Sequence, residues 1–135
     1  MRAKSLFLFI LPLIIISGCK KDKNQKTVLD GTYSGKFIET IQNSPGSPNN
    51  VMLSLKAGNH TSPGSIGFIT TGNGSFKING QTITFVDMGA YPDNTDYNST
   101  AVLSGLYNYT VKGDSLFLSK TNESNVVFTY KVKKQ

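Results

Sequence analysis

From residue 31 onward, apolar and polar positions alternate along the chain with a period of two residues, and no stretch repeats every 3.6 residues. Alternation of this kind predicts β-strands with one buried and one solvated face. Segments rich in Gly, Pro, Asn and Ser separate the alternating runs and are expected to be loops. The expected strands are 31–41, 51–57, 65–71, two within 75–85, 101–111, 115–120 and 125–132.

The clearest local signal is the hairpin over residues 75–85. A two-residue turn at Asn79-Gly80 suits the positive φ angles that tight hairpins need. This turn would pair Ile78 with Gln81 and Phe76 with Ile83. The apolar residues of both strands would then share one face.

Eight strands joined mostly by short connections predict an all-β protein. An antiparallel up-and-down barrel is the leading expectation, because eight strands can close on themselves and leave no free edge. A two-sheet β-sandwich is the alternative.

The first residues carry a different pattern. Arg2 and Lys4 precede an apolar run from Leu6 to Ile16, which is too short to span a bilayer and is typical of a signal peptide. The run ends in Ile16-Ser17-Gly18-Cys19, which resembles the lipobox of bacterial lipoproteins. The resemblance implies that Cys19, the only cysteine, becomes the lipidated N-terminal residue.

These features divide the chain into a lipoprotein signal peptide (1–18), a lipidated tether (19–29) and a β-barrel domain (30–135). Lysine rather than aspartate follows the cysteine, so the outer membrane is the expected location. Whether the anchored domain faces the periplasm or the cell surface is left open.

Charge is concentrated near the two ends of the chain. After removal of residues 1–18 the net charge is +4, and residues 20–26 and 131–135 each contribute +3. Residues 27–130 hold five lysines against seven acids, which excludes a basic nucleic-acid-binding body. Lysines in a tether close to a membrane would attract an anionic surface.

Residues 113–116, Gly-Asp-Ser-Leu, match the name-giving motif of the GDSL hydrolases. A nucleophilic serine needs a general base, and the only histidine, His60, lies in a segment expected to be a solvated loop. The Asp-x-x-His of that family does not occur in this sequence. A turn at Gly113-Asp114 with a structural Ser115 is therefore expected, and the protein is expected not to be an enzyme. The triplet at 114–116 also resembles an O-glycosylation acceptor of some bacterial envelopes.

No metal site or cofactor is expected. His60 alone cannot form a metal site, and Asp93 and Asp96 lack the ligand spacing of a calcium loop. With one cysteine, the chain can form neither an internal disulfide nor a cysteine cluster.

Two short segments resemble a known barrel family. Gly31-Thr32-Tyr33 stands where lipocalin-like and avidin-like barrels often carry a Gly-x-Trp pattern, and residues 113–134 are similar to the last hairpin of small lipocalin-like bacterial lipoproteins. The resemblance implies the same eight-stranded barrel and an envelope location. It does not imply one particular activity.

Two classes of non-catalytic function remain open. A binding module would hold a small, partly apolar ligand among inward aromatic residues. The protein would otherwise serve as an envelope accessory protein. The alternative is a protein-interaction or inhibitor module, like the small barrel lipoproteins that block lysozymes, which would act through its loops, above all 87–100, where Tyr91 and Tyr97 are the expected anchors. The inward aromatic residues are Tyr33, Phe37, Phe68, Phe76, Phe85, Tyr107, Tyr109, Phe128 and Tyr130.

Overall fold

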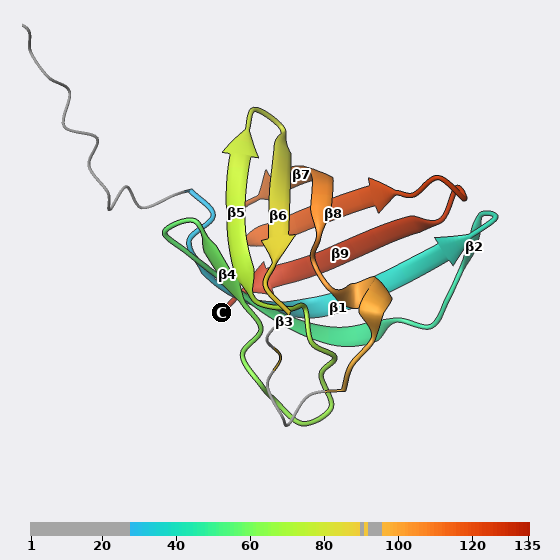
Figure 1. Cartoon of the computed structure of the whole chain (residues 1–135), viewed down its shortest axis with the longest axis horizontal. Coiled ribbons are helices and arrows are strands. Elements are labelled where there is room, and N and C mark those ends of the chain that lie inside the picture. Colours follow the sequence, from blue (N-terminus) through green and yellow to red (C-terminus); the bar gives the residue numbers. More distant parts are fainter. Residues whose placement is uncertain (1–27, 90, 92–95) are drawn as a thin grey trace, which may run out of the picture.

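The computed structural model describes residues 28–89, 91 and 96–135. These residues form nine β-strands and one short 3-10 turn (Figure 1). The elements are β1 (Gly31–Ile41), β2 (Ser44–Pro45), β3 (Asn49–Lys56), β4 (Asn59–Thr61), β5 (Gly74–Asn79), β6 (Thr82–Asp87), η1 (Ser99–Ala101), β7 (Gly105–Lys112), β8 (Ser115–Thr121) and β9 (Val127–Lys134).

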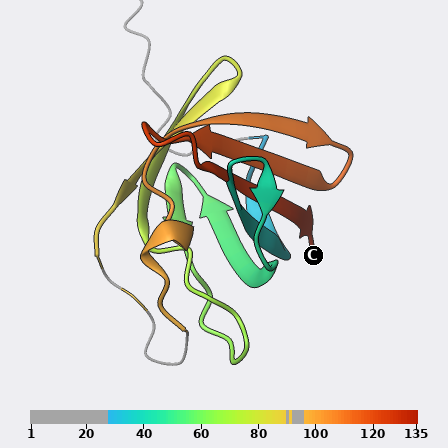
Figure 2. The same ribbon diagram turned by 90° about the vertical axis from the view of Figure 1, so that its right-hand side faces the viewer.

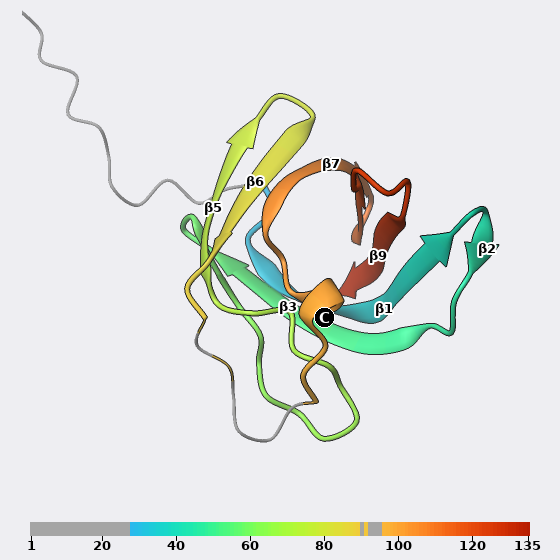
Figure 3. The ribbon, with the colours of Figure 1, turned by 45° about the vertical axis from the view of Figure 1, so that its right-hand side comes forward.

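Eight strands form a closed antiparallel barrel in which each pairs with the next along the chain, from β1 and β3 through to β9. The barrel closes because β9 returns to β1 in a register that runs from Tyr33 opposite Lys134 to Thr40 opposite Val127. Figure 3 shows the strands arranged as a ring. The predicted up-and-down barrel is confirmed. The extra strand β2 pairs only with the last two residues of β1.

The barrel has two unlike ends. At the tether end, where β1 begins, the chain makes tight turns, and the C-terminus lies beside the start of β1 (Figure 1). At the loop end the connections are longer, and the 62–73 connection and η1 lie on the same side of the barrel (Figure 2). The tether-end turns are 57–58, 80–81 and 113–114, and the loop-end connections are 42–48, 62–73, 88–104 and 122–126.

The predicted hairpin at 75–85 forms, but its turn lies one residue later than expected, which shifts the partner of each β5 residue by two positions along β6. Asn79 pairs with Thr82, so Gly80 and Gln81 make the turn, with a positive φ of 59° at Gly80. Glycine at the first central position suits a type II′ turn. This register sets Phe76 opposite Phe85 instead of Ile83, and Ile78 opposite Ile83 instead of Gln81. Because the shift is an even number of residues, the apolar side chains still share one face.

The prediction of a strand over residues 65–71 is wrong. The barrel takes its strand instead from Asn59–Thr61, within the segment expected to be a loop. Gly67 adopts φ 81° and Ile66 is 89% exposed, so the short apolar alternation here does not form a buried face. The chain then returns beside β3 in a parallel direction, where Ile69 N–H donates to the Asn50 carbonyl (2.9 Å).

The strand expected to begin at Ala101 begins at Gly105. Residues 99–101 form η1 instead, and Asn98 caps it by accepting a hydrogen bond from the Thr100 N–H (3.0 Å). Leu103 is fully buried, although it lies outside any strand. Apolar residues of this loop therefore fill the loop end of the core.

Side chains fill the barrel interior. Tyr33 lies near the tether end, where its hydroxyl donates to the carbonyl of buried Leu29 (2.8 Å). Tyr33 is thus bonded to the segment that leads into β1. The core consists of Leu29, Tyr33, Phe37, Val51, Leu53, Leu55, Phe76, Ile83, Phe85, Ala101, Leu103, Tyr107, Leu116, Leu118, Phe128, Tyr130 and Val132.

The Tyr130 hydroxyl joins the barrel wall to the loop end. Tyr130 is fully buried and donates to the Ala101 carbonyl at 2.6 Å. Tyr130→Phe would leave that buried oxygen without its partner, so we expect the free energy of unfolding to fall by about 2 kcal/mol in chemical denaturation. Tyr109→Phe is the matched control, because its hydroxyl bonds to Gly80 at an exposed position (3.0 Å), and it should cost less than about 1 kcal/mol. Equal losses in the two variants would contradict this account.

Candidate functional site

The predicted interior aromatics lie inside the barrel, with two exceptions. Tyr109 is only partly buried against the core, and Phe68, half-buried, lies in the 62–73 connection rather than on an inward strand position. The inward rings contact one another: the centroids of Phe37 and Tyr130 are 4.9 Å apart and those of Phe85 and Tyr107 are 5.6 Å apart. Ring-on-ring packing of this kind occupies the space in which a ligand would sit.

A lysine lies over this packed interior at the loop end. The Lys120 ammonium donates to the Ser104 carbonyl (2.7 Å) and lies 4.8 Å from the Tyr107 ring centroid and 5.6 Å from that of Phe128. Burial lowers the pKa of Lys120 and raises that of Tyr107 to about 12. The aliphatic stem and cation together cover the aromatic rings from the loop end.

The two loop tyrosines named from the sequence lie together. The rings of Tyr91 and Tyr97 are 5.0 Å apart, and the Tyr91 hydroxyl donates to Asp87 Oδ2 (2.8 Å). That hydrogen bond is the main reason why the pKa of Tyr91 rises to about 12. Tyr97 is 61% exposed. Tyr91 is therefore held by β6, while Tyr97 presents its ring to solvent.

Two loop-end connections form a joint structure that we call the loop lobe, residues 62–73 and the described part of 88–98. Backbone hydrogen bonds join them, since Thr70 N–H donates to the Asp96 carbonyl (2.9 Å) and Met88 N–H to the Asn73 carbonyl (2.7 Å). Large apolar side chains on this lobe are exposed: Ile66 by 89% and Met88 by 77%. Tyr97 is exposed as well, so three large apolar side chains of the lobe lie outside the barrel core.

His60 is not the solvated loop histidine that was expected. It lies on β4, is fully buried, and places Nε2 3.2 Å from the Val86 carbonyl oxygen. The His60 and Phe85 rings make a T-shaped contact, with their centroids 5.2 Å apart. Burial lowers the pKa of His60 below its ordinary value of 6.5, because the charged form would lose its hydration.

The Gly113-Asp114 turn forms as predicted, with Lys112 opposite Ser115 and φ 59° at Gly113. Ser115 lines a shallow groove on the outer wall with Lys131 and Lys133, whereas His60 is enclosed in the core. The two side chains therefore point to opposite sides of the barrel wall. Among the described residues, no three His, Cys, Asp or Glu side chains are grouped closely enough to hold a metal ion. Asp93 lies outside the described residues.

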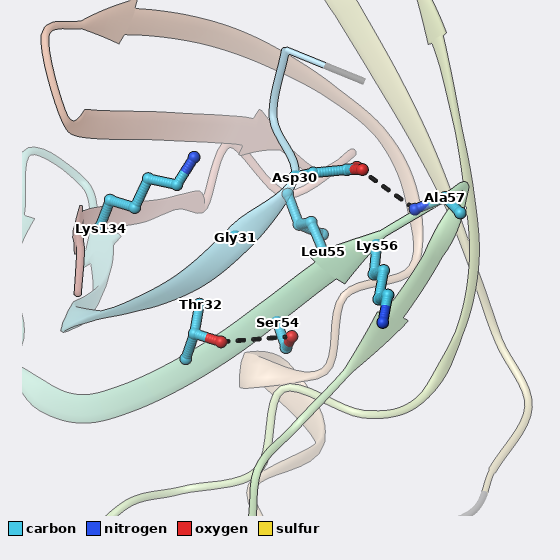
Figure 4. A pocket seen from close by; sticks show the side chains of 8 residues that line it. All are labelled: Asp30, Gly31, Thr32, Ser54, Leu55, Lys56, Ala57 and Lys134. Carbon is cyan, nitrogen blue, oxygen red and sulfur yellow. Dashed lines mark hydrogen bonds between the residues drawn. The ribbon is translucent and has the colours of Figure 1, made fainter. Parts of the chain in front are cut away.

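The tether end carries a groove of about 610 Å³ (Figure 4). The start of β1, the end of β3 and the last residue of β9 form it, and Lys56 and Lys134 flank it. Asp30 Oδ1 accepts a hydrogen bond from the Ala57 N–H (3.2 Å), which fixes the 57–58 turn against the start of β1. A side chain at Gly31 would overlap that of Lys134, so glycine is what allows this lysine to lie across β1.

Alternation alone could place the interior rings, but it gave no sign of this groove or of the buried His60. The groove depends on barrel closure, which brings Lys134 near residues 30–32 and 54–57. His60 has polar neighbours in the sequence, and its burial depends on a three-residue strand that no periodicity reveals.

No family model, curated protein or solved structure matches this chain. Cys19 and residues 1–18, which the sequence predicts to be a signal peptide, lie outside the described residues. Within residues 28–89, 91 and 96–135, the structure has no helix of the length and apolar character needed to cross a bilayer.

The buried histidine makes stability depend on pH. Since its folded pKa is lowered, the unfolded chain takes up a proton first as pH falls below 6.5. Stability is therefore full above this value and declines toward the lower folded pKa. We expect the free energy of unfolding of the wild-type chain to drop between pH 7.5 and 5.5, and we expect His60→Gln to reduce that drop. If the free energy of unfolding of the variant falls with pH as much as that of the wild-type chain, titratable groups other than His60 cause the drop.

Proposed function

We propose that the protein is a lipocalin-like envelope lipoprotein, anchored in the outer membrane through Cys19, and that its barrel is a rigid scaffold for a protein-binding loop lobe. It acts as an accessory or inhibitor module rather than as an enzyme. The observation that carries this proposal is the contrast between a filled interior and the exposed apolar side chains of the lobe, Ile66, Met88 and Tyr97.

The packed core weighs against a ligand inside the barrel. A small apolar molecule would have to displace rings such as Phe37 and Tyr130, which are fully buried and in contact with each other. Removing such side chains from a packed core costs several kcal/mol. The ligand-binding interpretation of the interior aromatics stays a prediction, and partner binding needs no such rearrangement.

The lobe has the composition of a contact surface. Aromatic residues and methionine are enriched at protein interfaces, and tyrosine is a frequent binding anchor. The Tyr97 ring packs at a tilt of 49° against that of Tyr91, which is itself bonded to Asp87, so the Tyr97 ring is already held before a partner arrives. Less conformational entropy is then lost on binding.

Non-catalytic action accords with the positions of the only histidine and of the serine in the hydrolase-like motif. Ser115 needs a base within hydrogen-bonding distance, and His60 is instead buried and directed at the Val86 carbonyl. Ser115 then has a structural role at the start of β8.

Anchoring is tested by membrane fractionation of cells that express the full chain. Wild-type protein should remain with the outer membrane after a salt wash, and Cys19→Ala should release it or leave it as an unprocessed precursor. The control is Ser17→Ala, which keeps a small residue before the cysteine. Mature, salt-resistant membrane association of the Cys19 variant would contradict lipidation.

Partner binding is tested by placing a photo-crosslinking amino acid at Tyr97 in cells. We expect a discrete adduct from this position, and we expect Ile66→Asp with Met88→Asp to suppress it. Leu106 is the matched control position, because it is 58% exposed on the wall strand β7. If both positions give the same adducts, or if the double substitution does not affect the adduct, the proposal that the loop lobe binds a partner is contradicted.

A further inference from the structure

The charged side chains of the barrel are segregated by end. Among the described residues, five lysines lie in the tether-end half of the barrel, four of them next to a turn or at the end of β9 and Lys77 three residues before the 80–81 turn. Two aspartates lie there as well, so the side chains carry a net charge of +3. All five lysines are exposed. This tether-end set consists of Lys56, Lys77, Lys112, Lys133 and Lys134, with Asp30 and Asp114.

The loop end has the opposite sign. Its described charged groups are four acids and one lysine, a net charge of −3. Lys36 and Lys131 lie between the two ends, opposite each other on β1 and β9. The loop-end set consists of Glu39, Asp87, Asp96 and Glu123, with Lys120.

The geometry of the tether end keeps its positive charges available. Lys133 approaches Asp114 at 3.4 Å, but both side chains are more than half exposed, so solvent and salt screen this pair. Asp30 is engaged by the Ala57 N–H. Lys56 and Lys134 flank the groove from two sides (Figure 4).

The lysines of this set are distributed around the barrel. They come from the tether-end halves of four strands, β3, β5, β7 and β9, which alternate with other strands in the closed sheet. Phe76 N–H donates to the Gly58 carbonyl (2.7 Å) and Lys134 N–H to the Asp114 carbonyl (2.8 Å), so the 57–58 turn is bonded to β5 and the 113–114 turn to the end of β9. Charges spread around a rim match a plane of many phosphates better than they match one small anion.

The anchor enters at this same end. Residues 28–30 precede β1 there, and Leu29 is held by Tyr33. In the sequence, residues 20–26 add four lysines and one aspartate. A lipid on Cys19 would therefore bring the positive end of the barrel, rather than the negative one, close to the membrane.

We propose that the tether end docks on an anionic phospholipid surface, with lipid phosphates seated between Lys56 and Lys134, and that the loop lobe consequently points away from the membrane. This inference rests on the proposed function in one respect: the lipid on Cys19 is what brings the tether end of the barrel close to the membrane. Each lysine that reaches an anionic surface strengthens binding roughly fivefold. The negative loop end is repelled by the same surface, so the orientation is selected by charge as well as by the tether.

The test uses the unlipidated chain from residue 20 to 135, which keeps every strand of the barrel. Its binding to phosphatidylcholine vesicles is measured with and without phosphatidylglycerol. We expect binding only with the anionic lipid and weakening as salt rises. Lys56→Gln with Lys134→Gln should weaken it roughly 10- to 30-fold. The two Lys→Arg substitutions at these positions should retain it.

The matched control is Lys36→Gln with Lys131→Gln, which removes the same two charges from the middle of the wall. If both pairs of substitutions weaken binding equally, the effect depends on net charge alone and the proposal is overturned. Absence of binding at low salt would also overturn it. Full competition by inorganic phosphate at matched ionic strength would indicate a site for a single anion instead. Because this chain carries no lipid, failure here leaves the Cys19 fractionation result standing, and the reverse also holds.

Discussion

The pairing of β1 with β9 is the constraint on which the rest of the structure depends. It joins the first and last strands over eight residue pairs and converts a meander into a closed wall. Once the wall is closed, each strand has one face toward a space of fixed size, and Phe37, Tyr107 and Tyr130 fill that space. Anything the protein recognises by surface contact therefore meets its outer wall or one of its ends.

Local sequence rules predicted much of this architecture. The alternation in β1, β3 and β8 was strong enough to identify buried faces, and the tight turn at Gly113-Asp114 formed as expected. The rules failed where a distant contact decided the outcome. The 62–73 connection alternates like a strand, but it lies beside β3 through the Ile69–Asn50 hydrogen bond, and the three-residue β4 takes its place in the barrel.

The candidate surfaces differ in how far they could be predicted. Tyr91 and Tyr97 stand out in a polar loop, so the sequence was enough to single them out. The tether-end groove was not predictable in this way, because Lys56 and Lys134 are far apart in the chain and line one groove only through the closure of the barrel. The separation of charge along the barrel has the same origin: residues from four strands are sorted by the direction of the strands, not by their order in the sequence.

The short strand β4 has a consequence for self-association. Only two residue pairs join β4 to β5, whereas six join β5 to β6. A barrel that opened at this junction would remain one continuous sheet from β5 through β9 to β1, β3 and β4, with β5 and β4 as its unpaired edges. Those edges are complementary, so two opened copies could exchange strands and form a swapped dimer. The 62–73 connection opposes this opening in the monomer. Ile69 and Thr71 hydrogen-bond to the Asn50 and Met52 carbonyls of β3, and these bonds hold the connection beside the junction.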